Sequence, residues 1–154
     1  MIELVEAVIF TGVPASGKST YFKQKFFDSH VRINLDMLRT RHREALLLRA
    51  CLEAVQPFVV DNTNVLPAER KVYIDAARSA RFRVIGYYFR TELRAAIGRN
   101  KQRAGKQAVP VPGLIAKWKR MEPPTYVEGY DELFTVDLTD TLDFVTAPVV
   151  RYSE

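Results

Sequence analysis

Residues 12–19 have the residue types and the spacing of a loop that binds phosphate groups. They read Gly12-Val13-Pro14-Ala15-Ser16-Gly17-Lys18-Ser19 and fit the pattern G-x-x-x-x-G-K-[ST]. In such a loop the glycines let the backbone approach the ligand, and the amides at the start of the next helix attract negative charge. The pattern predicts an ATP site in which Lys18 reaches the β- and γ-phosphates and the Ser19 hydroxyl ligates Mg²⁺. Thr20, the next residue, can donate to another phosphate oxygen.

Two absences narrow the class of phosphate-binding protein. Residues 100–103 read Asn-Lys-Gln-Arg and lack the aspartate of the N-K-x-D pattern of guanine-specific proteins, so a GTPase is disfavoured. Asp61 is followed by Asn62, so the adjacent pair of acidic residues usual in ATPase motors is missing. These absences favour a phosphotransferase, with a non-enzymatic ATP-binding switch as the alternative from another class.

Asp36 and Arg39 are candidates for the acceptor side of such a reaction. They form a D-x-x-R pattern after the predicted strand 31–35. Ligands of open α/β sheets bind at the carboxyl ends of the strands, so Asp36 is expected to face the phosphate loop and to accept the proton of an attacking hydroxyl. Arg39, one helical turn later, would hold the transferred phosphate. The structural alternative is a helix-capping aspartate with a surface arginine.

Residues 61–64, Asp-Asn-Thr-Asn, follow the predicted strand 58–60. Asp61 lies where phosphate-loop proteins place a carboxylate near the metal, so we expect it beside Mg²⁺ without direct contact. Thr63 offers an uncharged group to the acceptor at the same edge. The structural alternative is an Asn-rich turn.

The positive charge is concentrated in one part of the chain. The segment 78–120 holds twelve Lys and Arg residues and one acid, Glu92, a net +11 that leaves −6 for the rest of a chain with net charge +5. Arg99 and Arg103 lie four residues apart on a predicted helix, which places them on one face, where they could close over the triphosphate. A solvated basic helix is the structural alternative.

The elements that must position these residues alternate along the chain. Short apolar runs predict strands, with amphipathic stretches rich in helix formers between them. The expected strands are 7–10, 31–35, 58–60, 83–89 and 133–138, and the expected helices 18–27, 37–55, 67–80, 91–104 and 113–121. We therefore predict an α/β three-layer sandwich, the P-loop NTPase fold. A parallel sheet of about five strands carries helices on both faces. Residues 1–154 form one kinase domain with an Arg-rich helical lid at about 91–121.

The motifs together resemble the polynucleotide 5′-kinase family of P-loop phosphotransferases, the kinase domain of the phage polynucleotide kinase type. The resemblance covers about residues 7–138. It rests on GVPASGKST, NLDMLR, VVDNTNVLPAER, RNKQRAGKQAVP and MEPPTYVEGYDELF.

The resemblance implies transfer of the ATP γ-phosphate to a 5′-hydroxyl end of RNA or DNA. It assigns catalytic roles to Lys18, Asp36, Arg39 and Arg103, with Asp36 as general base. It implies nucleotide binding by residues 12–20, Arg99 and Arg103, and acceptor binding by Asp36, Arg39, Asp61 and Thr63. A small-molecule kinase for a nucleoside, sugar or antibiotic hydroxyl stays open as an alternative.

Composition excludes several other classes. The hydrophobic fraction of 47% and the charged fraction of 27% are typical of a globular protein. One cysteine, Cys51, rules out an intramolecular disulfide. No apolar run approaches the roughly 18 residues of a membrane helix, and the start of the chain lacks the pattern of a signal peptide. We expect a cytoplasmic protein whose partners are ATP and nucleic-acid ends and which has no membrane partner; the sequence does not indicate an oligomeric state.

Overall fold

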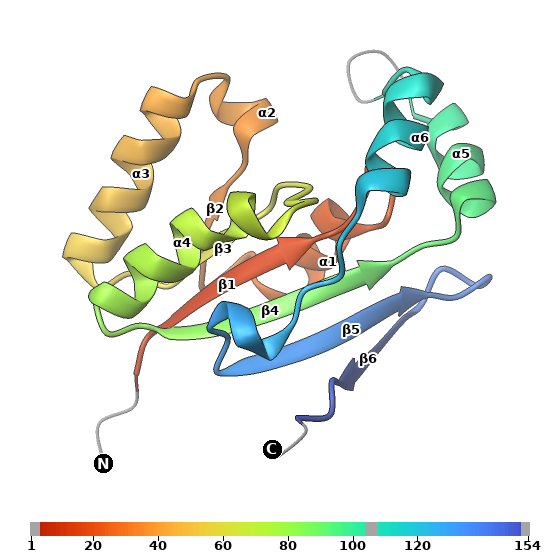
Figure 1. Cartoon of the computed structure of the whole chain (residues 1–154). Helices are drawn as coiled ribbons and strands as arrows, with labels where there is room; N and C mark the ends of the chain where they lie inside the picture. Colours follow the sequence, from red (N-terminus) through yellow and green to blue (C-terminus); the bar gives the residue numbers. More distant parts are fainter. Residues whose placement is uncertain (1–3, 104–107, 152–154) are drawn as a thin grey trace.

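The computed structural model describes residues 4–103 and 108–151. In these residues six strands form one sheet of order β2-β3-β1-β4-β5-β6, drawn in Figure 1. The strands are β1 (Glu6–Thr11), β2 (Val31–Ile33), β3 (Phe58–Val60), β4 (Arg83–Arg90), β5 (Glu132–Leu138) and β6 (Phe144–Pro148). All neighbours are parallel except β6, which pairs antiparallel with β5. The parallel part therefore has the five expected strands, and β6 is an addition that the sequence analysis missed.

Helices cover both faces of this sheet. They are α1 (Lys18–Lys25), α2 (Leu35–Leu38), α3 (Arg41–Ala54), α4 (Pro67–Ser79), α5 (Leu93–Lys101) and α6 (Val111–Arg120), with a 3₁₀ turn η2 (Tyr126–Glu128). Alternate residues of β1 point to opposite faces: Ala7 and Ile9 pack with α3 and α4, whereas Val8 and Phe10 pack with α1. This is the predicted three-layer P-loop NTPase fold.

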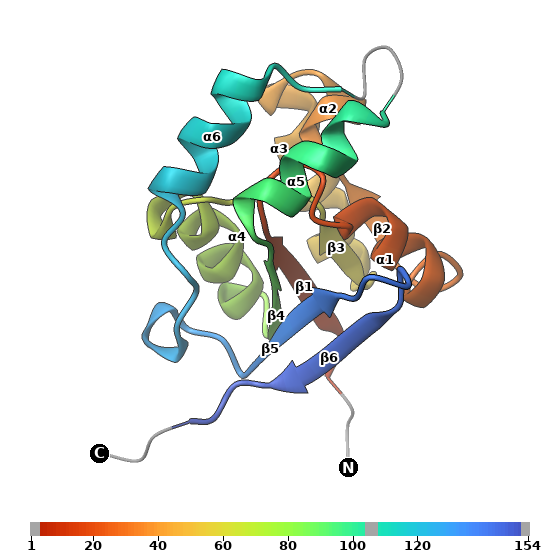
Figure 2. The same cartoon turned by 90° about the vertical axis from the view of Figure 1, so that its right-hand side faces the viewer.

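The helices that the sequence places in a lid stand together at one edge of the sheet. In Figures 1 and 2, α5 and α6 lie side by side above the carboxyl ends of the central strands, and α2 lies at the same edge. Residues 104–107 of the predicted lid lie outside the described residues. No helix in the described part of the chain is long and apolar enough to span a membrane.

The expected helix 37–55 is wrong in one respect, because it is two helices. The break is at Arg39, whose φ of 75° leaves the helical region. Asn34 caps α2 by accepting from the Met37 amide at 2.9 Å, and Thr40 caps α3 by accepting from the Arg43 amide at 3.1 Å. Two closely spaced caps thus override a run of good helix formers.

The lid also departs from expectation at its ends. The predicted helix 91–104 is shorter, since α5 ends at Lys101 and Arg103 follows the helix rather than sharing a helical face with Arg99. At the other end α5 begins at Leu93, and the buried hydroxyl of Thr91 has no hydrogen-bond partner among the described residues.

Candidate active site

The phosphate loop leaves no room for side chains at its two glycines. A Cβ on Gly12 would lie 2.9 Å from the Cβ of Phe89, and Gly12 donates its amide to the Thr63 carbonyl at 3.0 Å. Gly17, which precedes α1, has a φ of +98°, a conformation that L side chains rarely adopt. The loop is therefore joined to the end of β3 at its start and directed into α1 at its end.

Lys18 folds back into this loop. Its Nζ donates to the carbonyls of Gly12 and Val13, both at 2.8 Å, and only 9% of the residue is exposed. Burial lowers the pKa of Lys18 to about 8, although the nearby carboxylate of Asp61 opposes this effect. Near neutral pH a fraction of Lys18 is therefore the neutral amine, and bound phosphates would favour its charged ammonium form.

Ser19 and Asp61 meet beside the loop, together with an arginine that the sequence analysis missed. The Ser19 hydroxyl donates to Asp61 Oδ2 at 3.1 Å. Arg32 donates from Nε to the same oxygen at 2.8 Å and from Nη2 to Ser19 Oγ at 2.9 Å. Asp61 is 1% exposed, and Arg32 is its ionic partner. A cation inside the apolar run Val31-Arg32-Ile33 was the signal in the sequence.

These oxygens fit Mg²⁺ only together with a nucleotide. Among the described residues no group of three His, Cys, Asp or Glu could hold a metal ion by itself. Mg²⁺ commonly takes one or two protein oxygens and completes its shell with phosphate oxygens and water. A hydroxyl has one proton and two lone pairs. Ser19 gives the proton to Asp61 and one lone pair to Arg32, which leaves one lone pair for a metal.

Asp36 lies on α2, which is tied to the end of β3. The Asn34 side chain donates to the Asp61 carbonyl at 2.6 Å, and the Leu35 amide donates to Asn62 Oδ1 at 2.9 Å. The Asp36 residue is exposed, and its charge opposes the lowering of the Lys18 pKa by burial. Lys18, Asp36 and Asp61 all follow the carboxyl ends of parallel strands, at the same end of the sheet.

Two further predicted residues have different surroundings. Arg39 lies on the exposed turn between α2 and α3, not on a helix with Asp36. Burial lowers the pKa of the Arg103 guanidinium, and the charges of Asp36 and Asp61 oppose that effect. Both carboxylates therefore interact electrostatically with Arg103, which places its guanidinium near the site.

Both lid helices, α5 and α6, contact the phosphate loop or the segment after β3. Arg99 donates from Nε to the Ala15 carbonyl at 2.7 Å, and Lys117 of α6 donates to Thr63 Oγ1 at 3.4 Å. Leu114, fully buried against Val13, docks α6 on the loop. The sequence analysis missed Lys117 because its partner is 54 residues away in the chain.

A cavity of about 690 Å³ opens beside the phosphate loop, on the β4–β5 side of β1. Val13, Arg99 and Trp118 are among its lining residues. Trp118 is 40% exposed and donates to the Thr91 carbonyl at 3.0 Å. Asp36 and Asp61 follow β2 and β3 on the other side of β1, so the phosphate loop lies between the cavity and these two carboxylates.

Comparison with known families shows which family the chain belongs to. A family model described as an AAA domain, AAA_33, matches residues 39–123, more than half of the chain. The chain belongs to the AAA_33 family of P-loop kinases. P-loop kinases typically use ATP with Mg²⁺.

Two curated relatives align with nearly the whole chain. A bifunctional polynucleotide phosphatase/kinase of Schizosaccharomyces pombe is 26% identical over 90% of the chain, and an L-seryl-tRNA(Sec) kinase of Methanococcus maripaludis is 23% identical over 89%. The chain spans 35% of the first protein and 61% of the second.

Solved structures show the same fold at lower identity. Kti12 of Chaetomium thermophilum in complex with ADP-AlF3 superposes with a TM-score of 0.67 at 18% identity, covering 87% of this chain and 90% of that one. A gluconokinase of Sinorhizobium meliloti gives 0.65 at 18%, covering 92% and 87%. At this identity the likeness concerns the fold alone.

Proposed function

We propose that this AAA_33 kinase transfers the γ-phosphate of ATP to the 5′-hydroxyl end of a polynucleotide, as a kinase domain of the polynucleotide 5′-kinase type. The observation that carries the proposal is the exposed Asp36 carboxylate, held at the same sheet edge as Lys18 and Asp61. An exposed base suits an acceptor too large to enclose. The name of one curated relative specifies a polynucleotide, and the name of the other a seryl-tRNA.

On the nucleotide side, residues 12–20 would bind the phosphates through the Lys18 side chain and through backbone N–H groups, which Pro14 lacks. Arg99 and Arg103 would reach them from the lid. The cavity at Trp118 offers an aromatic surface for the base on the same side of the loop. Mg²⁺, held by Ser19 with Asp61 alongside, would neutralise charge on the phosphates when bound.

On the acceptor side, Asp36 would accept the proton of the 5′-hydroxyl as its oxygen bonds to the γ-phosphorus. The bond from that phosphorus to the β,γ-bridging oxygen breaks, and ADP leaves with the electron pair. Arg103 would stabilise the charge on the transferred group. Arg39, on the turn next to Asp36, and Thr63, at the end of β3, would bind the acceptor strand.

The test supplies ATP and Mg²⁺ with 5′-hydroxyl RNA and DNA oligonucleotides, nucleosides, sugars and aminoglycosides, and follows the labelled γ-phosphate. We expect label on 5′ ends. Efficient transfer to small molecules with none to oligonucleotide ends would refute the acceptor assignment.

A second comparison separates a kinase from an ATP-binding switch. Lys18→Ala should abolish function in both cases, because both need bound ATP. Asp36→Ala should abolish phosphoryl transfer by a kinase but leave the function of a switch intact. Asp28→Ala, the same substitution at an exposed carboxylate beyond α1, serves as the matched control.

A further inference from the structure

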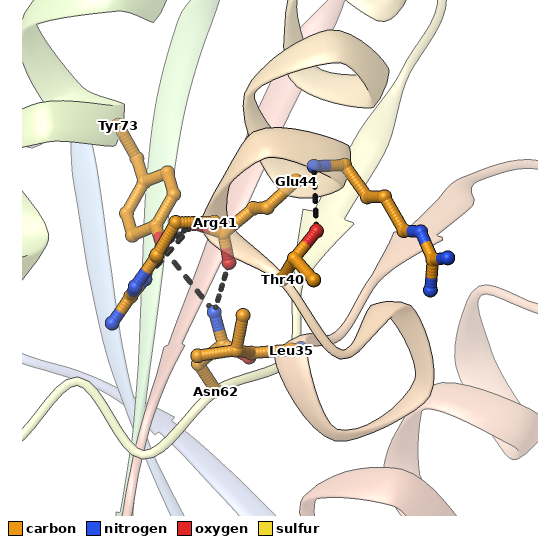
Figure 3. Close-up of polar contacts among 7 residues, drawn as sticks. Leu35, Thr40, Arg41, Glu44, Asn62 and Tyr73 are labelled. Carbon is orange, nitrogen blue, oxygen red and sulfur yellow. Dashed lines mark hydrogen bonds and ion pairs between the residues drawn. The ribbon is translucent and has the colours of Figure 1, made fainter.

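Glu44, on the first turn of α3, is a buried carboxylate outside the reaction described above. Only 6% of the residue is exposed. Its Oε1 accepts from the Tyr73 hydroxyl and from Arg41 Nη1, both at 2.9 Å, and its Oε2 accepts from Asn62 Nδ2 at 3.0 Å. Figure 3 shows these side chains converging between α3, α4 and the end of β3.

Asn62 links Glu44 to α2, the helix that carries Asp36. Because its Nδ2 donates to Glu44, its Oδ1 faces the other way and accepts the amide of Leu35 at 2.9 Å. An amide side chain has donors on one atom and lone pairs on the other. The carboxylate at position 44 therefore decides which end of Asn62 meets the backbone of α2.

The helix that receives this contact cannot hold itself in place. Isolated helices shorter than about 12 residues are marginal in water, and α2 is a single turn, Leu35–Leu38. Leu35 is its first residue, and Asp36 is the next. A shift of the Leu35 amide would therefore move Asp36 relative to the phosphate loop.

We propose that Glu44 is a positioning residue for Asp36, acting through the orientation of the Asn62 amide. The inference rests on the proposed role of Asp36 as the base.

Stability alone does not explain a carboxylate here. Its one ionic partner among the described residues is Arg41, whose side chain is 67% exposed. Burying a charge beside a solvated partner commonly costs free energy. Burial raises the pKa of Tyr73 to about 12, with the charge of Glu44 as the second cause, so Tyr73 remains a neutral donor to that carboxylate.

The test uses substitutions that keep shape and reverse polarity. Two donors, Tyr73 and Arg41, meet Glu44 at Oε1, so the amide oxygen of Glu44→Gln is expected to stay on that side and its NH₂ to face the NH₂ of Asn62. Asn62 would then turn and present a donor to the Leu35 amide. Adding Asn62→Asp restores the hydrogen bonds to position 44 and to Leu35, because the new carboxylate accepts from both. Glu53→Gln, an exposed glutamate on the same helix, is the control.

We expect Glu44→Gln to lower kcat for phosphoryl transfer by about 10- to 100-fold with an unchanged KM for ATP. The double variant should regain most of that loss. By NMR, amide exchange at Leu35 should speed up in Glu44→Gln and slow again in the double variant.

A folded Glu44→Gln protein with wild-type kcat, or a double variant as slow as the single one, would overturn the inference. The Leu35 exchange rates do not depend on the acceptor. If no oligonucleotide is phosphorylated, the proposed function fails; unchanged exchange in Glu44→Gln would mean that the inference fails as well.

Discussion

Binding of metal-free ADP to this kinase should draw a proton from solution onto Lys18. Burial in the loop lowers the pKa of Lys18 to about 8. Among the described residues its Nζ has neutral hydrogen-bond partners, the Gly12 and Val13 carbonyls and, at 3.4 Å, the Ser16 hydroxyl. Phosphates next to Nζ would favour the charged form and raise this pKa. The protein without nucleotide loses the proton as pH rises through 8, and the complex keeps it.

The size of the effect follows from that pKa. With a value of about 8, about a tenth of the free protein has neutral Lys18 at pH 7, about half at pH 8 and about nine tenths at pH 9. Binding should therefore take up about 0.1, about 0.5 and about 0.9 proton at these three pH values. The binding constant should fall about tenfold from pH 7 to pH 9, which is about 1.4 kcal/mol.

Titration calorimetry in two buffers of different ionisation enthalpy measures the uptake, with EDTA present so that no metal takes part. Phosphate groups with a second pKa near 6 stay ionised over most of this range. Lys18→Arg is the control: a guanidinium stays charged, so ADP binding to this variant should take up no proton. Equal uptake by wild type and Lys18→Arg, or a wild-type affinity that does not change with pH, would refute the reasoning.

Three further predictions concern the site and its support. Asp36→Asn should lower the single-turnover transfer rate by about 10²–10⁴-fold while calorimetry shows unchanged ADP affinity; a parallel loss of affinity would contradict the base role. Arg32→Lys keeps the charge but removes the two-pronged contact that orients Ser19 Oγ and Asp61 Oδ2. The Mg²⁺ concentration that half-saturates nucleotide binding should therefore rise about 10- to 100-fold, with metal-free nucleotide binding as the control. Glu128→Gln removes the ionic partner of the fully buried Arg70 and should lower the free energy of unfolding in urea by about 3 kcal/mol. A loss no larger than that of Asp137→Asn, in an exposed ion pair, would contradict this last prediction.

Local sequence signals were sufficient for the phosphate loop and for the sheet edge that holds the carboxylates. The loop motif lies between a strand and a helix, so the place of Lys18 follows from connectivity. Parallel strands end at one edge, so Asp36 and Asp61 could be predicted to face the same region although they are far apart in sequence. Both arguments need only the order of the elements.

Contacts between side chains from different elements could not be predicted in this way. Arg32 reaches a carboxylate 29 residues away, and Glu44 binds an amide 18 residues away. Spacing along one helix or strand carries no information about such pairs. The break at Arg39 is different, because Thr40 is a good capping residue and could have indicated the start of a new helix. The edge strand β6, Phe-Val-Thr-Ala-Pro, is itself mostly apolar, so its sequence carried a strand signal that was overlooked, although most of its residues are exposed.

The segment at the end of β3 connects the two halves of the site. Asp61 contacts Ser19, and the Thr63 carbonyl accepts the Gly12 amide, so both attach the segment to the phosphate loop. Asn62, between them, binds the first amide of α2 instead. Asp61 and Thr63 therefore contact the phosphate loop, and Asn62 between them contacts the helix that carries Asp36. The distance from the phosphate loop to Asp36 is thus set by one short stretch of backbone, so we expect a change in the backbone of that stretch to disturb phosphoryl transfer.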